Sequence, residues 1–252
     1  MIDEQDLVNQ APDRVVLVTG GTRGIGLEIA CQFLETGAEV YVTGTKQESD
    51  YDHPAFKEDR FNYFRADFTN NESLDRLAAF IVSLDKLDVL VNNAGINIIK
   101  SLNDVTSYDY DNLQAVNCRA PYMLSKAASK VMSLNKKGWI LNLGSIWSVI
   151  SKSMRSLYST SKSGITGMTR SMAVELASSN ILVNCISPGF VMTDLTRSSL
   201  SSIEIEELST KVPMERFAEP AEIARTAIFL TSEENTYLTG QNIIVDGGFT
   251  NV

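Results

Sequence analysis

The chain of 252 residues is poor in the residues that hold metals and disulfides. It has one histidine, His53, and three cysteines, Cys31, Cys118 and Cys185, which lie far apart and form no Cys-x-x-Cys pair. A structural zinc site needs about four clustered ligands, and a disulfide framework needs cysteines in even numbers. We therefore expect no metal site, reduced thiols and a cytoplasmic protein.

Positive charge and long apolar runs are also scarce. Lys and Arg number 22 against 31 Asp and Glu, which gives a formal net charge of -9. This surplus of negative charge repels nucleic-acid phosphates and anionic lipid surfaces. Residues 1–14 lack the basic and apolar regions of a secretory signal, and no run approaches the about 18 apolar residues of a membrane span. We expect no nucleic-acid partner and no membrane association.

Short apolar runs rich in β-branched residues alternate with stretches of helical periodicity along the chain. The runs are at residues 15–18, 40–42, 62–64, 89–91, 139–143, 181–186 and 243–245. Because they are apolar throughout, they are typical of strands covered on both faces and joined by helical crossovers. This pattern predicts an α/β fold, a single-domain Rossmann-type doubly wound parallel sheet of about seven strands with helices on both faces. We expect this domain over residues 13–252, behind a flexible tail of residues 1–12.

A glycine-rich loop follows the first predicted strand. Gly20, Gly24 and Gly26 lie between that strand and a helical pattern that runs to Gly37. In doubly wound sheets a ligand binds beyond the carboxyl ends of the strands, where glycines let a pyrophosphate approach a helix N-terminus. The spacing is G-x-x-x-G-x-G and no Walker lysine follows, so the loop predicts a dinucleotide site rather than a P-loop.

The residues after the second predicted strand favour a cofactor with a 2′-phosphate. A site for NAD usually offers a carboxylate there, whereas an arginine suits the phosphate of NADP. The chain has Thr43, Thr45 and Lys46 at this place, without an acid, and it has Arg23 in the glycine loop. Cations and hydroxyl donors together can bind a phosphate. We therefore expect NADP(H) in preference to NAD(H).

Ser145, Tyr158 and Lys162 form a candidate catalytic group. Ser145 ends a predicted strand, and Tyr158 and Lys162 share one helix face because they are four positions apart. A phenol has a reference pKa of about 10, and a neighbouring cation favours its anion. Lys162 is placed to supply that cation, so Tyr158 is a candidate proton donor near neutral pH.

The order of these motifs carries a family resemblance. With residues 92–95 (Asn-Asn-Ala-Gly) after the fourth predicted strand and Pro188-Gly189 after the sixth, the chain resembles the short-chain dehydrogenase/reductase family in its short single-domain branch. The resemblance covers residues 14–248. It implies an oxidoreductase that reduces a ketone to a secondary alcohol by hydride transfer from a nicotinamide cofactor.

The resemblance implies a catalytic tetrad. Ser145 would polarise the carbonyl oxygen, and Tyr158 would give it a proton. Lys162 would bind the nicotinamide ribose and lower the pKa of the tyrosine. Asn117 would hold a water of the proton relay through its main chain.

The resemblance also implies the cofactor contacts. Asp67 would meet the adenine, residues 93–95 would line the adenosine side, and the pattern P-G-x-x-x-T would close over the nicotinamide. The expected cofactor-binding residues are Gly20, Thr22, Arg23, Gly24, Ile25, Gly26, Thr43, Thr45, Lys46, Asp67, Asn93, Ala94, Gly95, Tyr158, Lys162, Pro188, Gly189, Val191 and Thr193.

The substrate side is expected around the segment after the sixth predicted strand. Residues 190–217 predict a pair of short helices in the place of a mobile lid. The expected substrate contacts are Ser145, Trp147, Met154 and Phe190, with Ile96 and Ile150 as further wall residues.

Within the family the chain most resembles the 3-oxoacyl-acyl-carrier-protein reductases. The segments 189–194, 212–216 and 237–240 carry this resemblance. It implies a 3-oxoacyl thioester as substrate and acyl carrier protein as a partner. The carrier is acidic and docks on a basic patch, for which Lys136 and Lys137 are the candidates.

Two departures keep other functions open. The loop 177–180 lacks the arginine that those reductases carry, and the segment 147–155 is bulkier and more polar than an acyl slot requires. A sugar-derived or other small soluble ketone is therefore an alternative substrate. A non-catalytic NADP-binding sensor or scaffold is an alternative of another class, against which the complete tetrad argues. The resemblance further implies a homotetramer.

Overall fold

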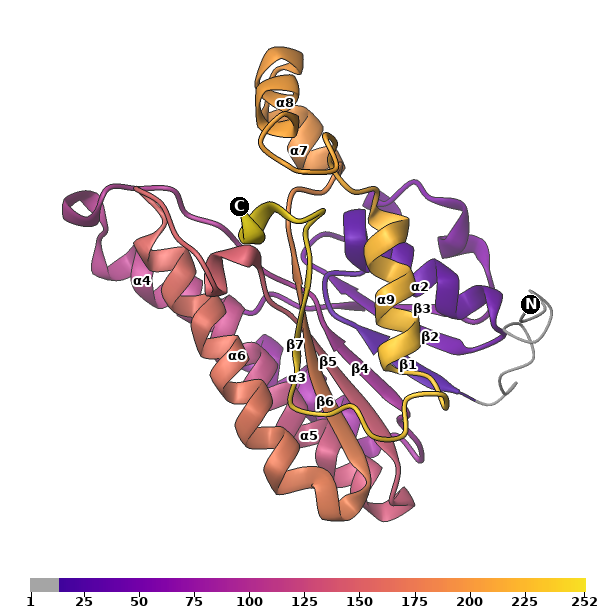
Figure 1. Cartoon of the computed structure of the whole chain (residues 1–252). Coiled ribbons are helices and arrows are strands. Elements are labelled where there is room, and N and C mark those ends of the chain that lie inside the picture. Colours follow the sequence, from indigo (N-terminus) through magenta and orange to yellow (C-terminus); the bar gives the residue numbers. More distant parts are fainter. Residues whose placement is uncertain (1–13) are drawn as a thin grey trace.

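The computed structural model describes residues 14–252. The predicted tail, residues 1–12, lies outside the described residues. Within the described part, seven strands form one parallel sheet in the order β3-β2-β1-β4-β5-β6-β7 (Figure 1). The strands are β1 (Val15–Val18), β2 (Glu39–Gly44), β3 (Phe61–Arg65), β4 (Val89–Asn92), β5 (Gly138–Leu143), β6 (Ile181–Pro188) and β7 (Asn242–Val245). The predicted fold class is confirmed.

The helices cover both faces of this sheet. Helices α2 and α9 contact each other on one face, and α3 and α5 do so on the other, which α6 also covers (Figure 1). The helices of the described part are α2 (Gly24–Glu35), α3 (Asn71–Ser83), α4 (Ser107–Gln114), α5 (Ala120–Asn135), α6 (Ser156–Leu176), α7 (Asp194–Ser199), α8 (Ser202–Ser209) and α9 (Pro220–Leu230).

Two apolar cores form because each strand is apolar on both faces. Val16 and Val18 lie in the core under α2 and α9, whereas Leu17 between them lies in the core under α3 and α5. All three side chains are fully buried. Burying one such side chain contributes roughly 1.5–3 kcal/mol relative to exposing it. Side chains alternate along a strand, so the apolar runs of the sequence are what a two-faced sheet requires.

The order in which the strands are added to the sheet reverses between β1 and β4. The strands β1, β2 and β3 proceed towards one edge, and β4 returns to the other side of β1. In doubly wound sheets the crevice outside the carboxyl ends of the strands at this reversal is where ligands bind. The fold thus places the glycine loop after β1 and residues 93–95 after β4 on opposite sides of one crevice.

The segment predicted as a lid forms the two short helices that the sequence indicates. Helices α7 and α8 project from the carboxyl edge of the sheet (Figure 1). The segment is tied to α9 by Arg216, whose guanidinium donates to both carboxylate oxygens of Glu222 at 2.6 and 2.7 Å. This pairing lowers the pKa of Glu222 to about 2.

Candidate cofactor and active site

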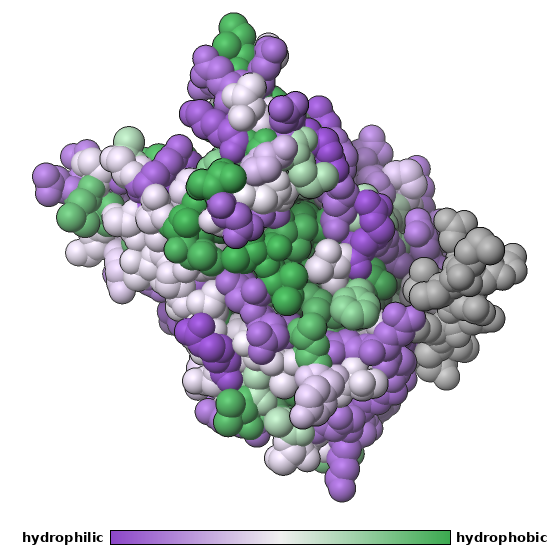
Figure 2. Space-filling view, in the orientation of Figure 1, coloured by the Kyte–Doolittle hydropathy of each residue, from purple (hydrophilic) through white to green (hydrophobic). Residues whose placement is uncertain are grey.

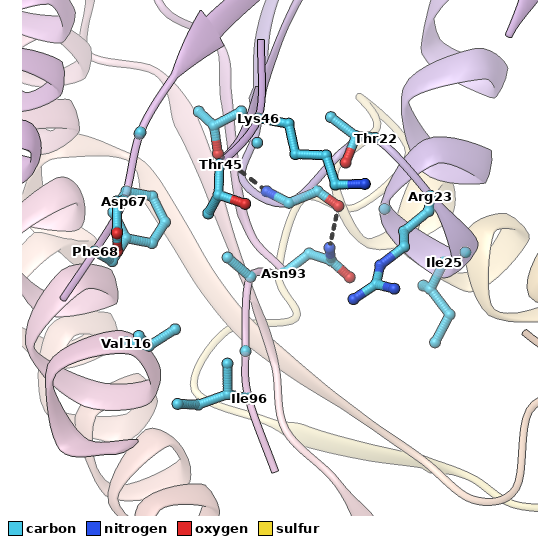
Figure 3. Close-up of a pocket in the computed structure, with 18 of the residues that line it drawn as sticks. Thr22, Arg23, Ile25, Thr45, Lys46, Asp67, Phe68, Asn93, Ile96 and Val116 are labelled. Atoms are coloured by element: carbon cyan, nitrogen blue, oxygen red, sulfur yellow. Dashed lines mark hydrogen bonds between the residues drawn. The ribbon is translucent and has the colours of Figure 1, made fainter. Parts of the chain in front are cut away.

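A cavity of about 640 Å³ opens between the ends of β1 and β4, where the strand order reverses (Figure 3). It is lined by fourteen of the residues expected to bind the cofactor: Gly20, Thr22, Arg23, Gly24, Ile25, Gly26, Thr43, Thr45, Lys46, Asp67, Asn93, Ala94, Gly95 and Thr193. The remaining five, Tyr158, Lys162, Pro188, Gly189 and Val191, lie outside its lining. The cavity therefore corresponds to the adenosine and phosphate side of the expected site.

The cavity is also lined by residues that the sequence did not predict there. Phe68 and Thr69 follow β3, so the rule that ligands sit beyond strand ends would have found them. Tyr51 does not directly follow a strand, so no pattern in the sequence predicted it at the cavity. The unexpected lining residues are Gly44, Tyr51, Ala66, Phe68, Thr69, Ile96, Val116 and Asp194, of which Ile96 was expected at the substrate instead.

The glycine loop closes tightly against β4. Gly20 has a φ of +63°, which few residues other than glycine adopt. A Cβ on Gly26 would lie 2.3 Å from Asn93 Nδ2 and 2.5 Å from the Gly20 carbonyl oxygen. The Asn93 amide itself donates to the carbonyl oxygen of Thr19 at 2.9 Å and to that of Gly20 at 3.0 Å, the second bond being drawn in Figure 3. Asn93 thus braces the loop from the neighbouring strand.

Helix α2 presents an open N-terminus to the cavity. Arg23 precedes the helix, its side chain makes no capping bond, and the first turn contains no acid. The first N–H groups of a helix have no intrahelical partner and carry partial positive charge. An uncapped N-terminus beside glycines that leave room for a ligand fits the pyrophosphate of a dinucleotide.

Two cations extend into the other side of the cavity. Arg23 comes from the glycine loop and Lys46 from the segment after β2, and both side chains are drawn towards the open space in Figure 3. Within residues 14–252 neither forms an ion pair. Thr43 also lines the cavity, but it is 1% exposed and its hydroxyl oxygen accepts a bond from the Gly20 N–H at 3.1 Å.

An aromatic cluster holds the Lys46 turn in place. The Tyr51 hydroxyl accepts a bond from the Lys46 N–H at 3.2 Å, and Tyr63 donates to the Lys46 carbonyl oxygen at 2.7 Å. Tyr51 stacks on Phe56 with ring centroids 5.5 Å apart. The backbone of Lys46 is thereby fixed at the cavity edge, while its ammonium group stays available to a ligand.

The far end of the cavity combines apolar walls with one carboxylate. Phe68, Val116 and Ile96 surround the space near Asp67 (Figure 3). Asp67 Oδ1 accepts bonds from the N–H and the hydroxyl of Thr69 at 2.9 and 2.7 Å, which orient the carboxylate. A flat apolar slot with an acceptor at its rim can hold a purine.

Asn117, Tyr158 and Lys162 of the expected tetrad come together beside this cavity. Tyr158 and Lys162 lie on α6, with Lys162 Nζ 5.7 Å from the Tyr158 ring centroid. A Cβ on Gly95 would lie 3.4 Å from Asn117 Oδ1 and 3.6 Å from Lys162 Nζ. The Lys162 ammonium is buried and donates to the Leu143 carbonyl oxygen at 2.6 Å.

Asn117 lies in a π-helical turn, Ala115–Arg119, between α4 and α5. Its amide donates to the Ile96 carbonyl oxygen at 2.9 Å and to Ser161 Oγ at 3.1 Å, and its Oδ1 accepts from the Ile96 N–H at 2.9 Å. The side chain thus fastens the loop after β4 to α6. Single π-turns inside helices are frequent at functional sites.

Ser145 follows β5 and leads into the short helix Ile146–Ser148, which packs against α6. It is 8% exposed, and its hydroxyl oxygen accepts a bond from the Trp147 N–H at 3.3 Å. Of the expected tetrad, Asn117, Ser145 and Lys162 are therefore buried, and Tyr158 is half-buried.

The segment after β6 reaches back across the cavity. Thr193 caps α7 by accepting a bond from the Thr196 N–H at 3.2 Å, and its Cγ2 would be 3.3 Å from a Cβ on Gly24. A Cβ on Gly189 would lie 2.8 Å from Asp246 Cα, so this turn also needs glycine. Pro188 ends β6, and Val191 is buried in the core beside α9.

The expected substrate residues have different surroundings. Phe190 stacks on Phe217 with ring centroids 5.1 Å apart and meets the edge of Phe249 at 5.1 Å. Trp147 is buried, whereas Met154 is 48% exposed and has a φ of +67°. Phe190 thus belongs to an apolar cluster before α7, whereas Trp147 and Met154 belong to the segment that leads into α6.

Membrane spans and metal clusters are absent from residues 14–252. None of the helices there has the length and apolarity that crossing a bilayer requires. No three His, Cys, Asp or Glu side chains of this part gather as metal ligands would.

Comparison with known proteins identifies the family. A family model described as enoyl-(acyl carrier protein) reductase matches residues 20–250. The 3-oxoacyl-[acyl-carrier-protein] reductase FabG of Chlamydia pneumoniae is 35% identical over 239 residues, covering 93% of this chain and 96% of the relative. The NAD-dependent glycerol dehydrogenase of Listeria innocua is 31% identical and covers 94% of each chain.

Solved structures agree with these relatives. A short chain dehydrogenase/reductase family protein superimposes with a TM-score of 0.83 at 32% identity, over 94% of this chain and 97% of that chain. ElxO with NADP bound superimposes with a TM-score of 0.87 at 29% identity, over 95% of this chain and 99% of that chain. The chain, with its doubly wound sheet, glycine loop and extensive likeness to these proteins, belongs to the short-chain dehydrogenase/reductase family of oxidoreductases, which act on CH–OH or ketone groups.

Proposed function

We propose that this protein reduces a ketone to a secondary alcohol with NADP(H), and that a 3-oxoacyl thioester is the first of two candidate substrates. The observation that carries the reaction is the meeting of Tyr158, Lys162 and Asn117 beside the cofactor cavity. A phenol beside an ammonium group can act as a general acid, and this one lies next to the cavity that would hold the cofactor. Family membership favours this enzyme over a non-catalytic sensor.

The catalytic side chains have distinct roles in this proposal. A bound nicotinamide supplies the hydride that the carbonyl carbon accepts. Ser145 donates a hydrogen bond to the carbonyl oxygen, and Tyr158 transfers its phenolic proton to the same oxygen as the C=O double bond becomes single. The Lys162 ammonium stabilises the phenolate that remains, and Asn117 keeps the loop after β4 against α6.

Arg23 and Lys46 are proposed to bind the 2′-phosphate of NADP. Both lie at the cavity and form no ion pair within residues 14–252, and no acid follows β2 at the place where NAD would need one. ElxO, a structural relative, has NADP bound, whereas the glycerol dehydrogenase relative is named as NAD-dependent. Support for NADP therefore rests mainly on this chain's own cations.

Replacing Arg23 by alanine tests this cofactor preference. The KM for NADPH should rise about 10- to 100-fold, because a charge-assisted phosphate contact is lost, while the KM for NADH should change little. Steady-state kinetics with both cofactors measures the ratio. Arg76→Ala, on an exposed position of α3, is the matched control. An unchanged NADPH-to-NADH ratio in Arg23→Ala would place the 2′-phosphate elsewhere.

The proposed thioester substrate draws support from two sources. The Chlamydia pneumoniae relative is named as a 3-oxoacyl-[acyl-carrier-protein] reductase. Figure 2 shows apolar surface gathered beneath the projecting α7 and α8, where an acyl chain could lie. Acyl carrier protein is the partner that this substrate implies. Of its two candidate docking residues, Lys136 is exposed, whereas Lys137 pairs with Glu233 at 2.5 Å.

A small soluble ketone is the second candidate substrate. The turn Ala177–Ser179 has no arginine for docking a carrier, and Lys152 and Arg155 lie against Trp147 beside Ser145. Charged side chains there favour a polar substrate over an acyl chain.

The homotetramer also stays a proposal, which is supported by the exposed side chains of Tyr108, Tyr122 and Tyr237.

One assay separates the two substrate candidates. Oxidation of NADPH is followed by absorbance with acetoacetyl thioesters and with a panel of small and sugar-derived ketones, and is repeated with NADH. The proposal expects rapid reduction of the thioesters with NADPH. Silence with thioesters and turnover of ketones would transfer the assignment to the second candidate. No turnover with any carbonyl compound and either cofactor would refute the proposed reaction.

A further inference from the structure

Two cations lie near the ring of one buried indole. Lys152 Nζ is 5.8 Å and Arg155 Cζ is 5.5 Å from the centre of the Trp147 ring. Trp147 itself is only 9% exposed. The indole face attracts both cations through its negative quadrupole. We call these three residues the Trp147 cation cluster.

The Trp147 cation cluster connects the two ends of the catalytic site. At one end the backbone N–H of Trp147 donates to Ser145 Oγ at 3.3 Å. At the other end Arg155 directly precedes α6, one helical turn before Tyr158, and its carbonyl oxygen accepts the first-turn bond from the Ser159 N–H at 2.8 Å. Arg155 is therefore close to Tyr158, and both cations approach the ring of the residue whose backbone contacts Ser145.

The positive charge of the cluster has no counter-charge in the described chain. Within residues 14–252 neither Lys152 nor Arg155 lies within 4.0 Å of a carboxylate. Arg155 Nε is buried and has no hydrogen-bond partner. Buried donors in folded proteins are nearly always paired, so an unpaired one asks for an explanation. A cation without an ion-pair partner is unexpected in this chain because acidic residues outnumber basic ones, 31 to 22.

Stacking on the indole does not satisfy these donors. The indole offers a donor N–H and no acceptor in the ring plane, so the N–H groups of the guanidinium find no hydrogen-bond partner in it. Burial lowers the pKa of Arg155, and the nearby Tyr158 opposes that shift. An arginine with an unpartnered buried donor and a lysine near the same indole offer cationic donors to a carboxylate or a phosphate.

We propose that the ketone substrate carries an anionic oxygen group, a carboxylate or a phosphate, which Arg155 and Lys152 bind over Trp147. The proposal rests on the ketone reduction proposed above and favours the soluble ketone over the thioester. The anion is held on one side of the carbonyl, and Ser145 and Tyr158 bind the carbonyl oxygen on the other. Arg155 and Lys152 are thus substrate-binding residues that determine specificity.

The experiment compares ketones in matched anionic and neutral pairs. One arm sets 3-oxo acids against their methyl esters, and the other sets phosphorylated hydroxyketones against the free hydroxyketones. In the unmodified enzyme kcat/KM should be higher for the anionic member of at least one arm, and the arm identifies carboxylate or phosphate. Arg155→Gln should lower kcat/KM for that anionic ketone about 10- to 100-fold, chiefly through KM, and leave its neutral partner nearly unchanged.

Two further variants complete the test. Arg155→Lys should retain part of the preference, because it keeps the charge but loses the planar fork of donors. Arg170→Gln, an exposed position farther along α6, should leave both members of each pair unchanged. If neutral ketones or thioesters are reduced as well as anionic ones, or if Arg155→Gln lowers both members equally, the anion site is refuted while the proposed reaction stands. If no ketone is reduced, the reaction and the anion site fall together.

Discussion

Replacing Tyr158 by phenylalanine is expected to lower kcat for ketone reduction by about 10²- to 10⁴-fold, the range that a general acid contributes. The variant keeps the ring that lies 5.7 Å from Lys162 Nζ and removes only the hydroxyl that donates the proton. The cavity of the adenosine and phosphate side does not include Tyr158, so NADPH affinity should change little. Turnover measured by NADPH absorbance and NADPH binding measured by calorimetry separate the two effects.

Tyr122→Phe provides the matched control for this prediction. Tyr122 lies on α5 and is 55% exposed, so loss of its hydroxyl should alter neither turnover nor binding. Turnover of Tyr158→Phe within a few-fold of the unmodified enzyme would show that another group donates the proton. Loss of NADPH binding in that variant would instead assign Tyr158 to the cofactor site.

Gly26→Ala should disrupt the cofactor site from within the fold. The added Cβ would lie 2.3 Å from Asn93 Nδ2 and 2.5 Å from the Gly20 carbonyl oxygen. The asparagine side chain can rotate away, but the carbonyl belongs to the backbone and must shift with the whole glycine loop. Overpacking of this kind costs about 1–3 kcal/mol of stability. Displacing the loop should also weaken NADPH binding at least about tenfold.

Gly167→Ala is the control for a glycine that has room. Gly167 lies in α6, and a Cβ there would meet nothing within 4 Å. Since alanine favours a helix by about 0.5–1 kcal/mol over glycine, this variant should be as stable as the parent or more stable. Thermal unfolding and NADPH titration of both variants make the comparison. Equal melting temperatures and equal NADPH affinities in the two variants would contradict the proposed tight packing at Gly26.

The local pattern of apolar residues in the sequence was sufficient to predict most of the fold. Most strands are short, apolar on both faces and followed by a helical period, so their positions could be predicted from neighbouring residues alone. The observed β6, Ile181–Pro188, extends two residues beyond the predicted run because Ser187 and Pro188 still pair with β7. Polar residues at a strand end carry no apolar signal, although the ladder continues through them.

The cofactor half of the candidate site was also readable from the sequence. The rule that ligands sit after strands identifies the glycine loop, residues 43–46 and residues 93–95 without any tertiary information. It did not identify Tyr51, which reaches Lys46 through a cluster with Phe56 and Tyr63. A contact between a loop and a strand end depends on how the loop folds back, and no periodicity records that.

The sequence by itself determined the α/β class, the glycine loop and the residue types of the expected tetrad, because these depend on local spacing. Only the tertiary structure decided which side chains are free to meet a ligand. Asn93 and Thr43 are occupied with bracing the glycine loop, whereas Arg23, Lys46, Lys152 and Arg155 have no ion-pair partner within residues 14–252. The reason is physical: whether a polar group is satisfied depends on atoms brought from distant parts of the chain, which the packing of the whole sheet and its helices sets.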